Sequence, residues 1–189
     1  MDKLVSAGME FLSNQSQNTG HGGGQSYTSG EDGPENVGQK ASNLAGSSGD
    51  PSFFSSIVAN IGQRKEQLAN EDIDEDEAER NHAEAYHQDK HGDDNSLAAA
   101  AAMQAFKKFT GGGGDSEQGQ GGGQGDFLAM AMSEASKLFD SKDADGKLLG
   151  GASKDSTVQK AGEMAMKLYF KNQAKQQGGV MGMAAQFMG

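Results

Sequence analysis

Two aspartates at alternate positions offer the clearest lead to chemistry in this sequence. The stretch SKDADGKL places Asp143 and Asp145 before Gly146, as in a calcium-binding helix–loop–helix. Such a loop needs oxygen ligands at six positions, and the last is a bidentate glutamate. With Gly146 as the loop glycine, that last position is Ala152, and the register shifted by one residue supplies no glutamate either. We therefore favour a simple turn, for which Asp and Gly are suited, and keep weak divalent metal binding by the two aspartates as an alternative.

A second candidate metal site is a pair of histidines in an acidic segment. His87 and His91 are four residues apart, and Glu84 lies one helical turn before His87. Side chains at this spacing on one helix face can hold zinc or copper. A polar helix also produces such pairs by chance, and no glutamate completes an HExxH motif. A solvated helix face is the favoured interpretation, with metal binding by Glu84, His87 and His91 as the alternative.

The rest of the sequence argues against an enzyme. The chain has 189 residues and no cysteine, which excludes disulfides, thiolate zinc sites and a cysteine nucleophile. It has no GxSxG nucleophile elbow, and its glycine runs lack the GxxxxGK[ST] pattern of phosphate loops. No triad can be built from its four histidines. We therefore predict no catalytic residue and no cofactor.

The chain is acidic, and one segment carries most of the charge. The formal net charge is −11, and residues 71–94 hold eleven acids against Arg80 and Lys90, a net charge of −9. Proteins bind phosphate backbones through clustered lysine and arginine. We therefore expect no nucleic acid among the partners.

Low hydrophobic content points to a chain that is partly disordered. Only 34% of residues are hydrophobic, and there are 29 glycines and no tryptophan. Residues 1–15 lack the continuous apolar stretch of a signal peptide or a membrane span. These features predict an intracellular protein, most simply a cytoplasmic one.

The first 49 residues are expected to be mostly disordered, apart from a short amphipathic helix at 3–12. From Asp50 the pattern becomes helical, because Asp50 is a good cap and Pro51 fits a first helical turn. The predicted helix, 51–69, has an apolar face formed by Phe53, Phe54, Ile57, Val58 and Ile61.

Asn70 is expected to cap an acidic, solvated helix over 71–91, which completes a helical segment at 50–92. Residues 95–177 are then predicted to form a module of three helices. Asn95 or Ser96 caps an alanine-rich helix that Gly111 ends, and a glycine-rich linker follows at 111–125.

The last two predicted helices begin at Asp126 and at Asp155 or Ser156, on either side of a loop at 141–153. The final helix has one apolar face, formed by Val158, Ala161, Ala165, Leu168 and Tyr169. Its opposite face carries Lys160, Lys167 and Lys171, which would suit a lipid surface. A Met-rich tail, 178–189, ends the chain.

Three strings in this module are alike, namely AMQAFKKF (102–109), AMSEASKLF (131–139) and AMKLYFKNQ (165–173). Together with MDKLVSAGMEFL, SLAAAAAMQAFKKF and FLAMAMSEASKLF, the module resembles a family of glycine-rich proteins from filamentous fungi called beta-flanking proteins. The resemblance covers roughly residues 80–177 and the first dozen. It implies a fungal, intracellular, helical domain of unknown function, with no catalytic or ligand residues to transfer.

The sequence as a whole predicts an all-α fold, a loose helical bundle of amphipathic and alanine-rich helices joined by glycine-rich linkers. The apolar faces of 3–12, 51–69 and 155–175 either pack on one another, which we favour, or bind a protein partner, a membrane surface or further copies of the chain. The leading functional hypothesis is a non-enzymatic, stress-associated protective protein that acts through disorder and conditional helix formation. A self-assembling or partner-binding helical module is the alternative, followed by a weak divalent metal-binding protein.

Overall fold

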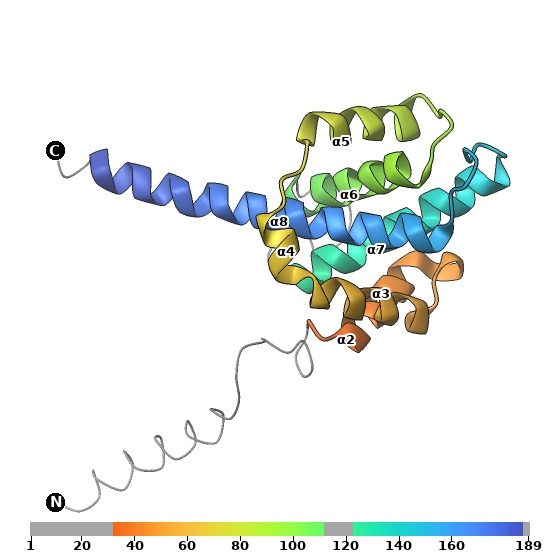
Figure 1. Ribbon diagram of the computed structural model, residues 1–189, viewed down its shortest axis with the longest axis horizontal. Helices are drawn as coiled ribbons and strands as arrows, with labels where there is room; N and C mark the ends of the chain where they lie inside the picture. Colours follow the sequence, from red (N-terminus) through yellow and green to blue (C-terminus); the bar gives the residue numbers. More distant parts are fainter. Residues whose placement is uncertain (1–31, 112–122, 187–189) are drawn as a thin grey trace, which may run out of the picture.

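The computed structural model describes residues 32–111 and 123–186, with side chains as far as residue 176. Within these ranges the fold is an all-α helical bundle, as predicted (Figure 1). Its elements are α2 (Pro34–Ala45), η1 (Gly46–Ser48), α3 (Pro51–Gln63), α4 (Lys65–Asn70), α5 (Glu75–His82), the π-helical turn η2 (Ala83–His87), α6 (Asp94–Gly111), α7 (Gln124–Ala144) and α8 (Lys154–Gln186). The predicted helix 3–12 and most of the predicted linker 111–125 lie outside the described residues.

Helices α6, α7 and α8 pack on one another and form the centre of the bundle. The alanine-rich part of α6, from Leu97 to Met103, exposes at most 6% of any side chain. Alanine side chains are short, so α6 can approach α5, α7 and α8 closely on different sides. Figure 1 shows α8 crossing the whole bundle and continuing beyond it.

Helix α2 corrects the prediction that residues 13–49 form a linker. Pro34 opens α2 at a position where its missing N–H is not needed. Val37, Ala41 and Ala45 recur every four residues and are at most 5% exposed. Between them, Gly38 lies so close to α3 that an added Cβ would be 2.7 Å from the Ser55 backbone nitrogen. This helix gives a weak signal in the sequence because, apart from Val37, glycine and alanine rather than large apolar residues form its buried face.

The predicted helix over 51–69 is two helices. Asp50 caps α3 as predicted, since its carboxylate accepts a hydrogen bond from the Phe53 N–H at 2.8 Å. The α-helix is interrupted at Arg64, and α4 continues from Lys65.

The predicted acidic helix over 71–91 is shorter than expected. It begins at Glu75, because Asp74 rather than Asn70 accepts a hydrogen bond from the helix start, the Glu77 N–H at 2.9 Å. The Asn70 side chain instead donates back to a carbonyl of α4. The helical segment ends in η2 at His87.

The later helices also start earlier than predicted. Asp93 caps α6, because it exchanges backbone-to-side-chain hydrogen bonds with Ser96 in a reciprocal pair. At α7, Asp126 accepts a hydrogen bond from the Gly123 N–H at 3.1 Å. At α8, Ser153 accepts one from the Ser156 N–H. The caps are therefore Asp93, Gly123 and Ser153. The residues predicted to open these helices lie two or three positions further along the chain, inside the first turn.

Candidate interaction surface

Two of the apolar faces that could pack within the chain or bind a partner, those of 51–69 and 155–175, lie inside the bundle. Eight of their side chains expose at most 2% of their surface, namely Phe54, Ile57, Val58, Ile61, Val158, Ala161, Ala165 and Leu168. Only Phe53 and Tyr169 are half-buried. These eight side chains are therefore packed inside the bundle and, in the described part of the chain, offer no exposed surface to a partner.

The histidine pair does not share a helix face. The helix ends at His87, and His91 lies beyond it in a connecting segment. The ring of His87 instead contacts His82 edge-on, with centroids 5.4 Å apart, and Glu84 pairs with Lys90 at 3.1 Å. The prediction that His87 and His91 share a helix face, on which the candidate metal site depended, is therefore wrong.

The aspartate-rich stretch is a helix end rather than a calcium loop. Asp143 lies in the last turn of α7, Asp145 is the C-cap, and Gly146 follows with φ +65°. The Asp145 carboxylate lies 3.7 Å from the Lys147 ammonium. Within 32–111 and 123–176, no three His, Cys, Asp or Glu side chains are grouped so as to hold a metal ion.

The acidic segment, expected to be solvated, is paired with the lysines of α8. Residues 71–75, which we call the strap, cross α8 where three of its lysines recur every four residues. Lys167 lies 2.6 Å from Glu71, Lys171 lies 2.8 Å from Asp72, and Lys175 lies 2.9 Å from Glu75. Lys171 also donates to a strap carbonyl at 3.0 Å.

These contacts pair the lysines that could face a lipid surface with acids of the same chain, and binding to such a surface stays a prediction. Lys160, further along the same helix, lies 2.8 Å from Asp94 at the start of α6. Lys167 holds the pKa of Glu71 below its ordinary value, and Lys171 does the same for Asp72. Among the described residues, none of the helices has the length and apolar character needed to cross a bilayer.

A second set of ion pairs fixes the connection between η2 and α6. Asp89 adopts φ +50° and accepts from Lys142 at 2.7 Å and from Lys147. Lys142 is 2% exposed and also donates to the Lys90 carbonyl at 3.0 Å. These hydrogen bonds lower the pKa of Asp89 to about 2. The connection is further joined to the α7–α8 loop by two backbone hydrogen bonds of Gly92.

The most polar part of the interior surrounds His82, which is 4% exposed. Its Nε2 donates to the Gln104 side-chain oxygen at 2.6 Å, and its ring stacks on Tyr86 at 5.1 Å. Burial lowers the pKa of His82, and the nearby Lys107 ammonium acts in the same direction. Burial also raises the pKa of the Tyr86 hydroxyl, as does the Glu134 carboxylate. A neutral imidazole that donates to an amide is a satisfied interior contact, so we assign it a packing role.

Half-buried aromatic side chains gather where α6 ends and α7 begins. The ring of Phe127, which is 1% exposed, lies 5.1 Å from that of Phe109, 6.0 Å from Phe106 and 6.4 Å from Tyr169. Ile73 from the strap and Met130 from α7 pack against the same cluster. We define the aromatic patch as the half-buried members of this group. They are Ile73, Phe106, Phe109, Met130, Met164 and Tyr169.

The aromatic patch unites four parts of the chain, so no single helix reveals it. The sequence analysis named only Tyr169 among its members. The signal in the sequence was the repeated pattern of Ala-Met before an aromatic helix end, in AMQAFKKF and AMKLYFKNQ, but it does not show that these ends meet. Phe106, Phe109 and Tyr169 from these strings converge on Phe127, because α6 and α8 each pack against α7.

A shallow cleft lies beside the strap, next to Phe170. It has a volume of about 260 Å³, and Lys167, Lys171, Glu71 and Asp72 contribute to its walls. Small-molecule sites commonly measure about 300–1,000 Å³ and are mostly apolar. The charged groups of this cleft already pair with one another. It is therefore a weaker candidate than the aromatic patch.

The fold and the patch define an all-helical protein whose most distinctive surface is apolar. In comparisons with known proteins, a family model described as a domain of unknown function, DUF7721, matches residues 34–114. That match starts at the first residue of α2 and ends just after α6, so an uncharacterised domain is present in this part of the chain. Neither the curated proteins nor the solved structures contain a significant match to the chain.

Proposed function

We propose that this chain is a non-enzymatic interaction module that binds an apolar helical segment of a partner protein at the aromatic patch. The observation that carries the proposal is the group of half-buried aromatic side chains around Phe127. Aromatic residues dominate the binding energy of protein interfaces, since they bury a large area and lose little conformational freedom. An amphipathic helix typically binds to such a surface through apolar side chains one turn apart.

The packed interior is the reason to prefer this proposal to a protective function. A protectant that acts through conditional helix formation has no standing core. In the described residues, Phe54, Ile61, Leu68 and Leu97 are at most 1% exposed, and they belong to one connected apolar cluster. A chain with such a core presents a fixed surface, which suits specific recognition better than conditional folding does.

We further propose that the chain is a member of the glycine-rich fungal beta-flanking family and acts inside the cell, in the cytoplasm. The strings SLAAAAAMQAFKKF and FLAMAMSEASKLF support the family, and two of the aromatic residues around Phe127 lie in the first string. A fluorescent fusion of the full chain, imaged in a filamentous fungus, tests the location. Signal confined to the medium or to an organelle would contradict it.

Photo-crosslinking through the aromatic patch tests the binding function. We would replace Phe109 with benzoyl-phenylalanine in the full chain and, as a matched control, replace Phe53, a half-buried aromatic residue of α3 outside the patch. After irradiation in a cell extract, the proposal expects one protein to be crosslinked to the chain that carries the photo-reactive residue at position 109. The same protein should not be crosslinked to the chain that carries it at position 53. That protein is then purified and titrated calorimetrically against the wild type, Phe109→Ser and Phe53→Ser.

The affinity of the purified partner decides the outcome. Removing one aromatic side chain at the centre of an interface costs about 1.4 kcal/mol or more, so Phe109→Ser should raise the Kd at least about tenfold. Phe53→Ser should leave the Kd unchanged, with the helical content of both variants checked by circular dichroism. Equal capture from both positions, or a Kd that Phe109→Ser does not change, contradicts the proposal.

A further inference from the structure

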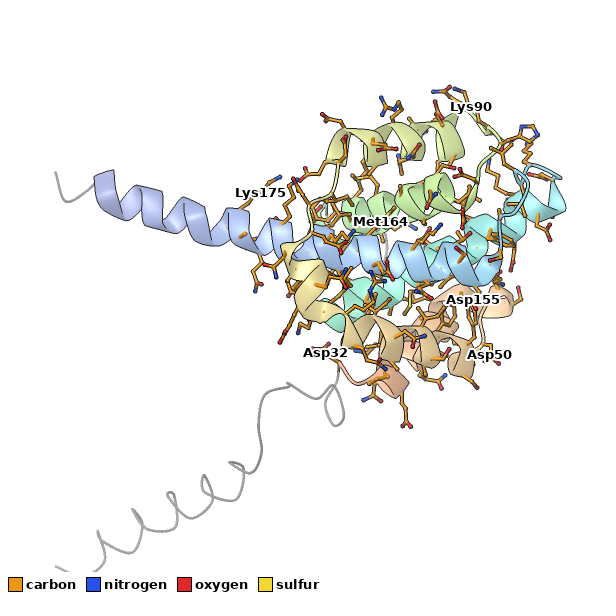
Figure 2. The ribbon with its side chains drawn as sticks, in the orientation of Figure 1. Asp32, Asp50, Lys90, Asp155, Met164 and Lys175 are labelled. Atoms are coloured by element: carbon orange, nitrogen blue, oxygen red, sulfur yellow. The ribbon has the colours of Figure 1, made fainter. Side chains whose placement is uncertain are left out.

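The aromatic patch lies beside the points where two further segments of the chain join the bundle. Residues 112–122 connect Gly111, the last residue of α6, to Gly123 before α7. Residues 1–31 lead to Asp32, whose carboxylate accepts a hydrogen bond from the Gly125 N–H at 3.0 Å. Gly125 lies two residues before Phe127, at the centre of the patch. Figure 2 labels Asp32 at one edge of the bundle.

Only one of these two segments carries side chains that can cover an apolar surface. Residues 112–122, GGGDSEQGQGG, contain no apolar side chain. Residues 3–12 contain Leu4, Val5, Phe11 and Leu12, which would share one side of a helix. A helix of this length is marginally stable alone in water and needs a surface to pack against.

We propose that residues 3–12 dock on the aromatic patch of the same chain and so compete with the partner. This inference rests on the proposed function, since it names how the same surface is regulated. Residues 13–31 join the two parts, and nineteen residues of glycine-rich chain span about 24 Å on average. A tether of that length raises the effective concentration of residues 3–12 at the patch to about 1 mM.

The tether sets the size of the competition. A contact with an intrinsic Kd of about 0.1 mM, facing an effective concentration of about 1 mM, is occupied about nine-tenths of the time. A partner would then bind about tenfold more weakly than it binds the free patch. Phe11→Glu with Leu12→Glu should release the segment and strengthen partner binding by this factor.

The absence of cysteine allows a direct test in the full chain. A nitroxide attached through Ser6→Cys broadens the magnetic resonance signals of nearby methyl groups. We expect strong broadening at Ile73 and Met130, which belong to the patch, and none at Leu44 and Leu149, which are 43% and 48% exposed elsewhere. Adding Phe11→Glu and Leu12→Glu to the labelled chain should restore the patch signals.

Mixing separates docking within one chain from docking between copies. In the key sample, nitroxide-labelled chains without isotope are mixed with isotope-labelled chains that carry no nitroxide. Broadening of Ile73 and Met130 in this mixture would mean that a second copy supplies the segment, which overturns the inference. Unchanged patch signals in the singly labelled chain would overturn it as well.

The two proposals can fail separately. If the nitroxide leaves the patch unaffected while Phe109→Ser still weakens partner binding, the inference is wrong and the binding function stands. If residues 3–12 dock but Phe109→Ser does not change partner affinity, the proposed function is wrong, and the patch serves only to hold the N-terminal segment.

Discussion

Helix α2 packs against α3 so closely that a single methyl group added at Gly38 tests the arrangement. A Cβ at this position would lie 2.7 Å from the Ser55 nitrogen and 2.9 Å from the Pro51 carbonyl oxygen. Both atoms belong to the backbone of α3, so the two helices must move apart. In an exposed helix, by contrast, replacing glycine with alanine stabilises by about 1 kcal/mol.

The magnitude follows from these opposing effects. Overpacking commonly costs about 1–3 kcal/mol, and a clash with backbone atoms lies at the upper end because no rotamer change relieves it. Subtracting the gain of about 1 kcal/mol in helix propensity leaves a loss of about 2 kcal/mol for Gly38→Ala. For a chain of this size, that loss lowers the Tm by roughly 4–8 °C.

Urea unfolding followed by circular dichroism measures the effect, with Gly150→Ala as the matched control. A Cβ at Gly150 would meet no atom within 4 Å. We expect Gly150→Ala to stabilise slightly, by less than about 1 kcal/mol, because alanine restricts the unfolded chain. A gain in stability for Gly38→Ala equal to that of the control would refute the packing of α2 on α3.

Three further predictions concern the interior and its titration. His82 has a lowered pKa in the folded chain, so the unfolded chain binds a proton below pH ~6.5 that the folded chain does not bind. The free energy of unfolding should therefore fall as the pH drops through that value. His82→Gln should remove this step from a plot of urea midpoint against pH. Asp89 has a folded pKa of about 2, so its contribution is complete above the unfolded pKa of about 4 and is lost between pH 4 and 2. Because Glu71 and Asp72 also have lowered pKa values, Asp89→Asn should reduce, but not abolish, the fall of the urea midpoint with pH in that range. An unchanged slope would contradict the assigned ion pairs. Phe54→Ala should destabilise by about 3–5 kcal/mol because its side chain is fully buried, whereas Leu44→Ala, at a 43% exposed position, should change the unfolding free energy by less than about 0.5 kcal/mol.

The helices that the sequence predicted are those with strong local signals. Asp50 and Pro51 mark the start of α3, and large apolar residues recur at helical spacing after them, so three-dimensional contacts were not needed to recognise it. Helix α2 carries equally regular spacing at Val37, Ala41 and Ala45, but alanine contributes little to a hydropathy pattern. Its burial depends on a close approach to α3 that the sequence does not encode locally.

The pairing of charges could not be predicted from local spacing. The contacts between the strap and α8 join residues about a hundred positions apart, such as Lys171 with Asp72 and Lys175 with Glu75. The composition of residues 71–94 indicates only a strong negative charge. Whether such a segment is solvated or paired depends on which helix packs beside it, and that is decided by the apolar faces of α6 and α8.

The ion pairs and the aromatic patch occupy different faces of the same part of α8, and both depend on the same rotation of that helix. Lys167 and Lys171 point to the strap, while Leu168 and Tyr169 pack toward Phe127. Leu168 is 2% exposed and Ala165 is fully buried, so apolar packing already favours one rotation of this part of α8. Exposed ion pairs add little to the free energy of unfolding, but each pair forms only when the two segments have one relative orientation. The acidic strap therefore favours the same rotation of α8 as the apolar packing does, the one in which Tyr169 faces Phe127.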